Sequence, residues 1–314
     1  MTGTVDIYGP AAPELRIVEQ TLRNDVAHDP PEVSRPMSEL LEAGGKRIRP
    51  TLVLLSAMCG AYERDPAISA AIAAEVTHAA TLVHDDVIDR SPTRRGRPTV
   101  AAALGEEPAI VIGDFYFAKA YEWAARTNRP EAVAVLAGAV MEMCAGEVRQ
   151  QSIRYIYSTG IDEYMRRIEA KTATLTAACC DIGALLGGLA DPEREALRAY
   201  GRELGLAFQI ADDVLDYTGT EGEVGKPIGH DVAEGFATLP FMLASIKLED
   251  NRRLDAHEAH RVAEEVRNSR GPQRALDEAR KHADAARQRL RTVGGRKATD
   301  AMAALTDYVV SRKL

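Results

Sequence analysis

The stretch AISAAIAAEVTHAATLVHDD, residues 67–86, is an Ala-rich run without glycine or proline. Alanine is the strongest helix former, and its small side chain lets neighbouring helices approach closely. Because the run is apolar on nearly all sides, we expect a helix in the centre of a domain rather than on its surface. The run ends in two aspartates, so the expected core helix carries negative charge at its end.

Further Ala- and Leu-rich stretches continue this pattern, and after about residue 250 charge-rich amphipathic stretches typical of an outer layer replace them. No alternating strand pattern is sustained along the sequence. The sequence therefore predicts one all-α domain over residues 36–314, with a central helix bundle and no β-sheet. Residues 1–35 are expected to form an N-terminal segment leading into it, because HDPPEVSRP (28–36) is a proline-rich break.

The composition is that of an ordinary globular protein, with 46% hydrophobic and 27% charged residues among 314. The 39 Lys and Arg against 47 Asp and Glu give a formal net charge of -8, which argues against a nucleic-acid partner. No secretory signal or long apolar run is visible, so we expect no stable membrane insertion. The four cysteines form no CxxC pair, which favours reduced thiols and a cytoplasmic location.

Two aspartate triplets with identical spacing occur in LVHDDVIDR and in FQIADDVLDY. In a helix, residues i and i+4 share a face, so the first and last carboxylates of each triplet point the same way and repel each other. Carboxylate oxygens suit Mg²⁺, which keeps several waters and readily bridges to phosphates. We therefore predict a cage for Mg²⁺ and a diphosphate between facing helices, with the metal ligands Asp85, Asp86, Asp89, Asp212, Asp213 and Asp216.

Basic side chains near the triplets are candidates for binding phosphate. GGKRIRP (44–50) places Lys46 and Arg49 after two glycines, which let a backbone approach an anion closely. A helix start with solvated charges fits the same residues. Arg94 and Arg95 follow the first triplet in a segment with two prolines and a glycine, which should leave the helix.

Other polar residues lie inside apolar helical stretches. Lys171 stands beside Thr172, and a buried lysine needs an anionic partner such as a phosphate or a carboxylate. His84, next to the first triplet, is either a substrate contact or a hydrogen-bonded polar neighbour of the acids. Gln209 is either a hydrogen-bonding core residue or an amide dipole directed at developing positive charge.

The order of motifs from Gly44 to Pro240 resembles that of the trans-polyprenyl diphosphate synthases. The motifs are GGKRIRP, HAATLVHDDVIDRSPTRRGRPT, GDFYFAKA, AGEVRQ, EAKTATL, FQIADDVLD and GKPIGHDVAEG…TLP. The resemblance implies an all-α isoprenoid synthase fold with a central cavity among long helices. It also implies a homodimer, as is usual in this family.

The resemblance implies Mg²⁺-dependent head-to-tail elongation of an allylic diphosphate with isopentenyl diphosphate, using about three Mg²⁺ ions. Pyrophosphate leaves, the isopentenyl double bond attacks the resulting carbocation, and the pyrophosphate removes a proton. The residues implied in catalysis are Asp85, Asp86, Asp89, Lys171, Thr172, Gln209 and Asp212. Those implied in substrate binding are Lys46, Arg49, His84, Arg94, Arg95, Lys171, Thr172, Gln209 and Lys226.

Product length is expected to depend on residues before the first triplet. Family members that stop at farnesyl often carry an aromatic residue about one turn before the motif, where this chain has Ala80 and Thr81, with Thr77 a further turn away. These small side chains leave the region unblocked, which predicts an all-trans product longer than farnesyl, either geranylgeranyl or a longer chain. A short-chain farnesyl or geranylgeranyl diphosphate synthase remains an alternative.

One position departs from the family pattern. The family commonly has GKxTLP after the second triplet, whereas GFATLP here places Phe236 where that lysine would be. One positive charge near the diphosphates is therefore missing, so a subunit of a heteromeric prenyl synthase is a second alternative. A terpene cyclase of the same fold and a helical scaffold with surface acids are less well supported, because both triplets and the GGKRIRP segment are complete.

Overall fold

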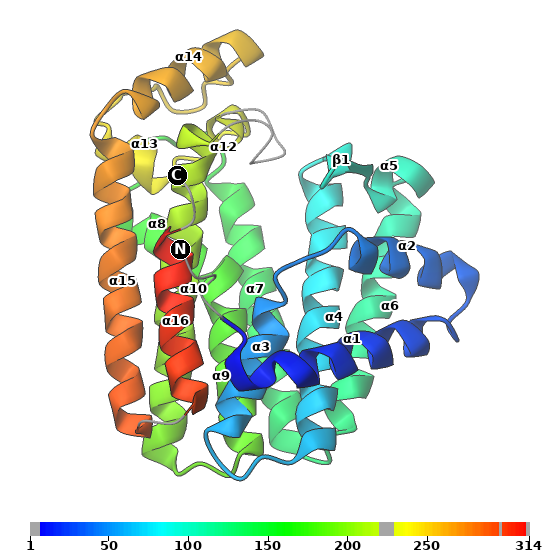
Figure 1. Ribbon diagram of the computed structural model, residues 1–314. Coiled ribbons are helices and arrows are strands. Elements are labelled where there is room, and N and C mark those ends of the chain that lie inside the picture. Colours follow the sequence, from blue (N-terminus) through cyan, green and yellow to red (C-terminus); the bar gives the residue numbers. More distant parts are fainter. Residues whose placement is uncertain (1–6, 220–228, 295–296, 312–314) are drawn as a thin grey trace, which may run out of the picture.

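The computed structural model of the protein describes residues 7–219, 229–294 and 297–311, and these form a helical bundle (Figure 1). The N-terminal half contains η1 (Gly9–Ala11), α1 (Ala12–Val26), α2 (Pro31–Glu42), α3 (Ile48–Met58), α4 (Arg64–Ile88), α5 (Val100–Leu104) and α6 (Glu106–Ala125). The middle contains α7 (Pro130–Ser152), α8 (Ile161–Ile168), η2 (Glu169–Ala173), α9 (Thr174–Leu186) and α10 (Asp191–Thr218). The last part contains α12 (His230–Ala233), α13 (Leu239–Leu243), α14 (Ala256–Arg267), α15 (Gly271–Val293) and α16 (Lys297–Ser311).

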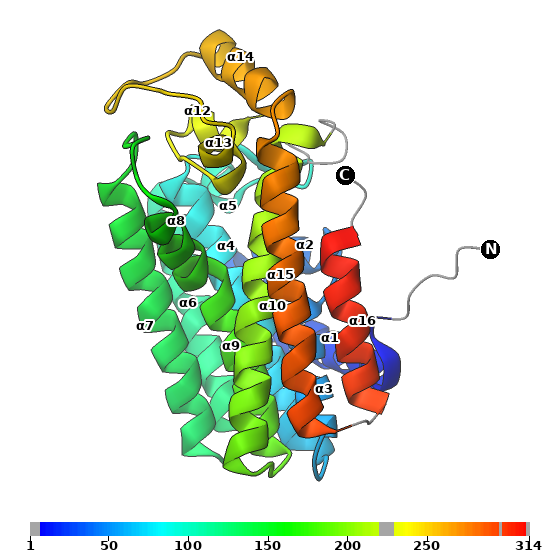
Figure 2. The same cartoon turned by 90° about the vertical axis from the view of Figure 1, so that its left-hand side faces the viewer.

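The expected core helix is α4, whose side chains from Ala67 to Thr77 are all buried. It packs mainly on α6 and α3, while α10 packs on α9 and α15 (Figures 1 and 2). By length and composition α4 could cross a membrane, but 72% of its apolar window is buried inside the bundle. The Ala-rich sequence therefore makes a central helix, because small side chains let the neighbouring helices approach on several sides.

Two glycines bring α10 into close contact with the segment that carries Lys171. A Cβ added at Gly205 would lie 2.6 Å from the Cα of Ala173, and one at Gly201 would lie 2.5 Å from the carbonyl oxygen of Thr176. Neither distance is compatible with a side chain at these positions. The close backbone approach allows short side chains on the two helices to hydrogen-bond directly.

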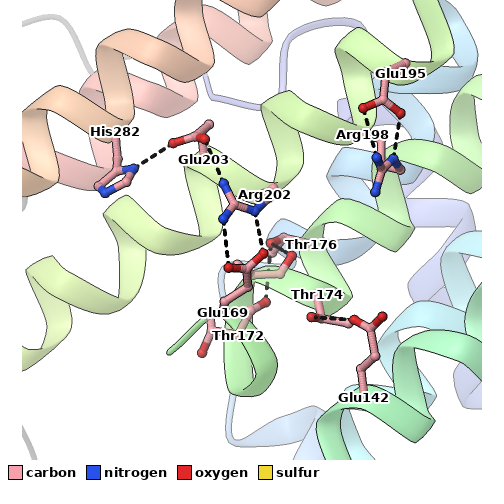
Figure 3. A network of polar contacts seen from close by, with 11 residues as sticks. Glu142, Glu169, Thr172, Thr174, Thr176, Glu195, Arg198, Arg202, Glu203 and His282 are labelled. Carbon is pink, nitrogen blue, oxygen red and sulfur yellow. Dashed lines mark hydrogen bonds and ion pairs between the residues drawn. The ribbon is translucent and has the colours of Figure 1, made fainter. Parts of the chain in front are cut away.

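The segment η2 is a π-helical turn that joins α8 to α9. Such turns insert one extra residue into a helix and are frequent at functional sites. Arg202 of α10 holds the first residue of the turn, because its Nε and Nη2 donate to the Glu169 carboxylate at 2.5 and 2.7 Å (Figure 3). Arg202 also contacts Glu203, which is bonded in turn to His282 of α15. The turn is thus tied to two neighbouring helices.

The structure differs from the sequence-based prediction in two respects. The prediction of no β-sheet is wrong for one short hairpin, in which β1 (Thr93–Arg94) pairs antiparallel with β2 (Arg97–Pro98). The boundary predicted between residues 35 and 36 falls inside α2. Leu15, Val18 and Leu22 of α1 lie in the same buried cluster as α3 and α4, so the N-terminal helix belongs to the main core. The proline-rich break is real, but it separates only α1 from α2.

Candidate active site

The first aspartate triplet lies at the C-terminal end of α4. Asp89 caps this helix, and its N–H donates to the carbonyl oxygen of Asp85 at 2.8 Å. Burial, together with the negative charges of Glu147 and Asp89, raises the pKa of Asp85, and Lys171 opposes this effect. Three acidic side chains thus surround one lysine, and the excess negative charge favours a bound cation.

Lys171 projects from the π-helical turn toward this acidic group. Its Nζ lies 3.7 Å from Glu147 Oε2 on α7. Burial alone would lower the pKa of this lysine, but the neighbouring Asp85 and Glu147 raise it overall. Lys171 therefore remains charged and has the anionic surroundings that its position in an apolar helix predicts.

Asp86 is oriented differently from its two neighbours. It is 3% exposed, and both of its oxygens accept hydrogen bonds from Arg94, with Nε at 2.9 and 3.0 Å and Nη2 at 2.8 Å from Oδ1. A carboxylate held in this bidentate way positions the arginine and has little capacity left for a metal. Asp86 therefore holds Arg94 and the hairpin, and the direct metal contact stays a prediction.

A cavity of about 1060 Å³ lies between α4 and α10. Cationic side chains from the loop before α3 and from the hairpin line one side of it, and acidic side chains of α10 line the other. The structure brings together these predicted residues on its wall: Lys46, Arg49, Arg94, Arg95, Gln209, Asp212, Asp213 and Asp216. The basic residues and the second triplet of the predicted site thus line one space, whereas Asp85, Asp86, Asp89, Lys171 and Thr172 are not part of its wall.

The arginines at the cavity differ in their partners. Arg47 is bonded to Glu19 at 3.0 Å and to Glu75 at 2.5 Å, so its charge is compensated within the protein. Arg49 is different, because its buried Nε has no hydrogen-bond partner among the residues that the structure describes. Burial lowers the pKa of Arg49. A buried cationic donor at a cavity wall needs an anion, as phosphate binding would supply.

The structure does not place His84 at the cavity. Its Nε2 lies 3.0 Å from the carbonyl oxygen of Ile110 on α6, and its ring packs against Phe117. Only one residue before Asp85, His84 lies about 100° round the helix from that residue, which turns it toward α6. Sequence reasoning missed His78, which lines the cavity. The sequence could have indicated this position of His78, because His78 lies seven residues before Asp85 and therefore on the same face of the helix.

The three aspartates of the second triplet differ in their exposure. Asp212 is exposed at the cavity, whereas Asp213 and Asp216 are buried. Asp216 Oδ2 accepts from the backbone N–H of Asp231 at 3.3 Å. Burial and the nearby charge of Asp231 raise the pKa of Asp213. Asp212 is therefore the residue of this triplet best placed to contact a metal.

Thr172 and Gln209 meet beside the second triplet. The hydroxyl of Thr172 donates to Gln209 Oε1 at 2.6 Å, and Gln209 Nε2 donates to Asp213 Oδ1 at 2.8 Å. Gln209 is thus hydrogen-bonded to its neighbours and also lines the cavity, and the direction of its dipole toward positive charge stays a prediction. Of this pair, Gln209 lines the cavity and Thr172 is buried behind it.

Phe236 does not point at the acids. Its ring centroid lies 5.7 Å from the Arg154 guanidinium and 5.5 Å from that of Arg167, so the ring contacts two cations. Arg154 is additionally paired with Glu234. The other predicted phosphate contact in this region, Lys226, lies outside the described residues.

The three residues predicted to control product length are not on the cavity wall. Thr77 and Ala80 are fully buried, and the hydroxyl of Thr81 donates to the carbonyl oxygen of His78 at 2.8 Å. By their spacing they share the face of α4 from which His84 contacts α6. The cavity is lined instead by other residues of α4, namely Glu75, His78, Ala79 and Leu82.

The chemistry of these acids fits Mg²⁺. Asp85 and Asp89 stand on one helix and Asp212 on another, and all three offer hard oxygen ligands. Within residues 7–219, 229–294 and 297–311, no three acidic, histidine or cysteine side chains converge into a closed metal site. This arrangement fits a metal that binds one or two carboxylates and completes its coordination with water and substrate phosphates.

A helical bundle whose cavity is lined by cations and by the second aspartate triplet, with the first triplet at the end of α4, fits an all-α synthase that handles diphosphates. A family model described as "Polyprenyl synthetase" matches residues 30–270, so the chain belongs to the polyprenyl synthetase family. The predicted family, fold class and prenyltransferase activity are thereby confirmed.

Relatives of different product classes resemble the chain over nearly all its length. Heptaprenyl diphosphate synthase component 2 of Bacillus subtilis is 35% identical over 308 residues, 96% of this chain and 88% of that protein. A short chain isoprenyl diphosphate synthase of Methanothermobacter thermautotrophicus is 35% identical over 311 residues, 95% and 96% of the two chains. The polyprenyl synthase of Caulobacter crescentus, solved with calcium and isoprenyl diphosphate, has a TM-score of 0.93 at 35% identity, covering 100% of this chain and 99% of that chain.

Proposed function

We propose that the protein elongates an allylic diphosphate with isopentenyl diphosphate, head to tail, and releases an all-trans polyprenyl diphosphate longer than farnesyl. The observation that carries the proposal is the cavity with acids on one wall and partly uncompensated cations on the other. One wall suits a metal-bound allylic diphosphate, and the other suits the diphosphate of the second substrate.

The acidic wall would hold the leaving group. Asp85, Asp89 and Asp212 would bind Mg²⁺, which neutralises the pyrophosphate as the allylic C–O bond breaks. Lys171, already charged beside these acids, would add a positive charge to the same phosphates. Arg94 would do so from the hairpin, in the position that Asp86 maintains.

The cationic wall would bind isopentenyl diphosphate. Lys46, Arg49 and Arg95 line it, and His78, which also lines it, would contact the diphosphate in place of His84. The isopentenyl double bond would then attack the carbocation, and the released pyrophosphate would accept the proton that is lost. Thr172 and Gln209 would stabilise the carbocation through their oxygen lone pairs.

Product analysis tests the proposal. Purified protein is incubated with isopentenyl diphosphate, Mg²⁺ and each of geranyl, farnesyl and geranylgeranyl diphosphate, and dephosphorylated products are identified by mass spectrometry. We expect chains beyond fifteen carbons from farnesyl diphosphate, and no products in the presence of EDTA. Return of farnesyl diphosphate unchanged would reject the long-chain product, and products that end at farnesyl would favour the short-chain alternative.

Replacing Ala80 with phenylalanine is expected to shorten the main product to farnesyl. The added ring would fill the region between α4 and α6 about one turn before Asp85, which the family resemblance makes the place where chain length is limited, although Ala80 does not line the cavity. Ala80 is fully buried, so overpacking would also cost about 1–3 kcal/mol of stability. Ala67→Phe is the matched control, because Ala67 is equally buried at the far end of α4. An unchanged product length in Ala80→Phe would place the growing chain elsewhere.

We also propose a homodimer formed through the outer faces of α6 and α7. These neighbouring helices expose Val111 (65%), Met141 (72%) and Val148 (74%), which are large apolar side chains. Sedimentation is expected to give twice the chain mass of 34.0 kDa, and Val111→Asp with Val148→Asp is expected to give a monomer. A monomeric wild-type protein that gains activity only with a different chain would instead support the heteromeric alternative.

A further inference from the structure

Tyr164 of α8 is a buried tyrosine that reaches the second aspartate triplet. It is 1% exposed, and its hydroxyl donates to Asp213 Oδ2 at 2.7 Å. The guanidinium of Arg167 lies 5.4 Å from the centre of its ring, and this arginine is fixed by a bond from Nη2 to the carbonyl oxygen of Ala237. The tyrosine is thus held on both its polar end and its ring.

The hydroxyl of Tyr164 is the first member of a chain of hydrogen bonds that continues through Asp213 and Gln209, both on the cavity wall, to Thr172. Asp213 accepts from Tyr164 on one oxygen and from Gln209 Nε2 on the other. Because the amide nitrogen of Gln209 is committed to the carboxylate, its oxygen must face Thr172, whose hydroxyl donates to it at 2.6 Å. A hydroxyl that donates in this direction presents its lone pairs elsewhere.

The π-helical turn explains how one helix can supply both ends of this chain. Tyr164 and Thr172 are eight residues apart, which in a regular α-helix would turn them about 80° away from each other. One extra residue in the turn lowers the total rotation by about 100° and so leaves the two side chains only about 20° apart, which lets both face α10. There they meet Asp213 and Gln209, which lie one helical turn apart on α10. The Glu169–Arg202 pair holds the first residue of this turn (Figure 3).

We propose that Tyr164 is a positioning residue for chain elongation, acting through Asp213 to hold Gln209 and Thr172 with their oxygen lone pairs available to the developing carbocation. The inference rests on the proposed function and goes beyond the metal and phosphate contacts. Tyr164 itself contacts no substrate. In its absence the carboxylate of Asp213 loses one of two donors and can rotate, so the amide of Gln209 loses its fixed orientation.

Tyr164→Phe tests this role by removing one hydroxyl. We expect kcat for elongation to fall roughly 10- to 100-fold, while KM for both substrates stays within about twofold, because the loss affects the transition state more than binding. Tyr200→Phe is the matched control. Tyr200 is also fully buried, its hydroxyl donates to the carbonyl oxygen of Met302 at 2.8 Å, and it lies away from the cavity. Tyr200→Phe should lower Tm by about as much as Tyr164→Phe does, and it should leave kcat unchanged.

A double-mutant cycle with Gln209→Ala separates positioning from general loss of structure. If Tyr164 acts through Gln209, adding Tyr164→Phe to Gln209→Ala lowers kcat little further. Additive losses, or a fall in kcat no larger than that of Tyr200→Phe, would overturn the proposal. A wild-type protein that makes no product contradicts the proposed function itself, whereas an active wild type with a normal Tyr164→Phe contradicts only the role of Tyr164.

Discussion

Asp85→Asn is expected to lower kcat/KM for elongation about 1000-fold, because a lost metal ligand at the leaving group costs about 4 kcal/mol of transition-state stabilisation. The amide keeps the size of the side chain but loses its charge. Burial, with Glu147 and Asp89, raises the pKa of this carboxyl more than Lys171 lowers it, so the folded protein gains little from the charge without a metal. We therefore expect Tm without Mg²⁺ to stay the same or to rise.

The control for this variant is Asp114→Asn. Asp114 lies on α6, is 68% exposed in its side chain and is 3.7 Å from His84 Nε2. It carries the same chemical change outside the cavity and should retain wild-type activity. Addition of Mg²⁺ with pyrophosphate should raise Tm of the wild type and of Asp114→Asn, but much less that of Asp85→Asn. Equal activity of the two variants would remove Asp85 from the metal site.

Arg49→Met is expected to raise stability while nearly abolishing activity. The buried Nε of Arg49 has no partner within the described part of the chain, so a methionine removes an uncompensated donor and keeps the apolar stem. We expect a gain of about 1 kcal/mol, or about 2 °C in Tm. KM for isopentenyl diphosphate should rise roughly 100-fold, because a charge-assisted phosphate contact in a buried site contributes about 3 kcal/mol.

Arg47→Met, two positions before Arg49, is expected to lower the stability of the protein. Arg47 is paired with Glu19 and Glu75, and the side chains of Arg47 and Glu75 are each 11% exposed. Its removal breaks the ion pair of the buried Glu75, which keeps only the longer-range attraction of Arg49 and Arg95, and should cost about 3 kcal/mol. Urea unfolding measures the change in the free energy of unfolding, which should be positive for Arg49→Met and negative for Arg47→Met. A destabilised Arg49→Met with normal KM would show that Arg49 supports the fold and has no role in substrate binding.

Local sequence was sufficient for the helices and for the chemistry of the acids. An Ala-rich run without helix breakers predicts a buried helix, and α4 is one. The i, i+4 spacing of Asp85 and Asp89 fixes their common face without knowledge of any other element. The same geometry would have favoured His78 over His84, since seven residues return to the same face and one residue does not.

The individual roles within each triplet could not be obtained in this way. Asp86 is held by Arg94, eight residues later in a hairpin that no strand pattern indicated. Asp213 is held by Tyr164, 49 positions earlier in the chain. Three aspartates that are equal in sequence therefore become one exposed and two enclosed side chains in the second triplet.

The sequence by itself determined the helical class, the position of each carboxylate on its helix and the kind of ion that the carboxylates suit, because these follow from contacts within one or two helical turns. Tertiary structure decided which acids remain available, which buried arginine nitrogen has no hydrogen-bond partner among the described residues and which face of α4 meets the cavity. Those outcomes depend on side chains from distant elements, such as Arg47 with Glu75 and Tyr164 with Asp213. Burial increases the contribution of these pairs to stability, since a charge removed from water is stabilised only by the partners that the fold brings to it.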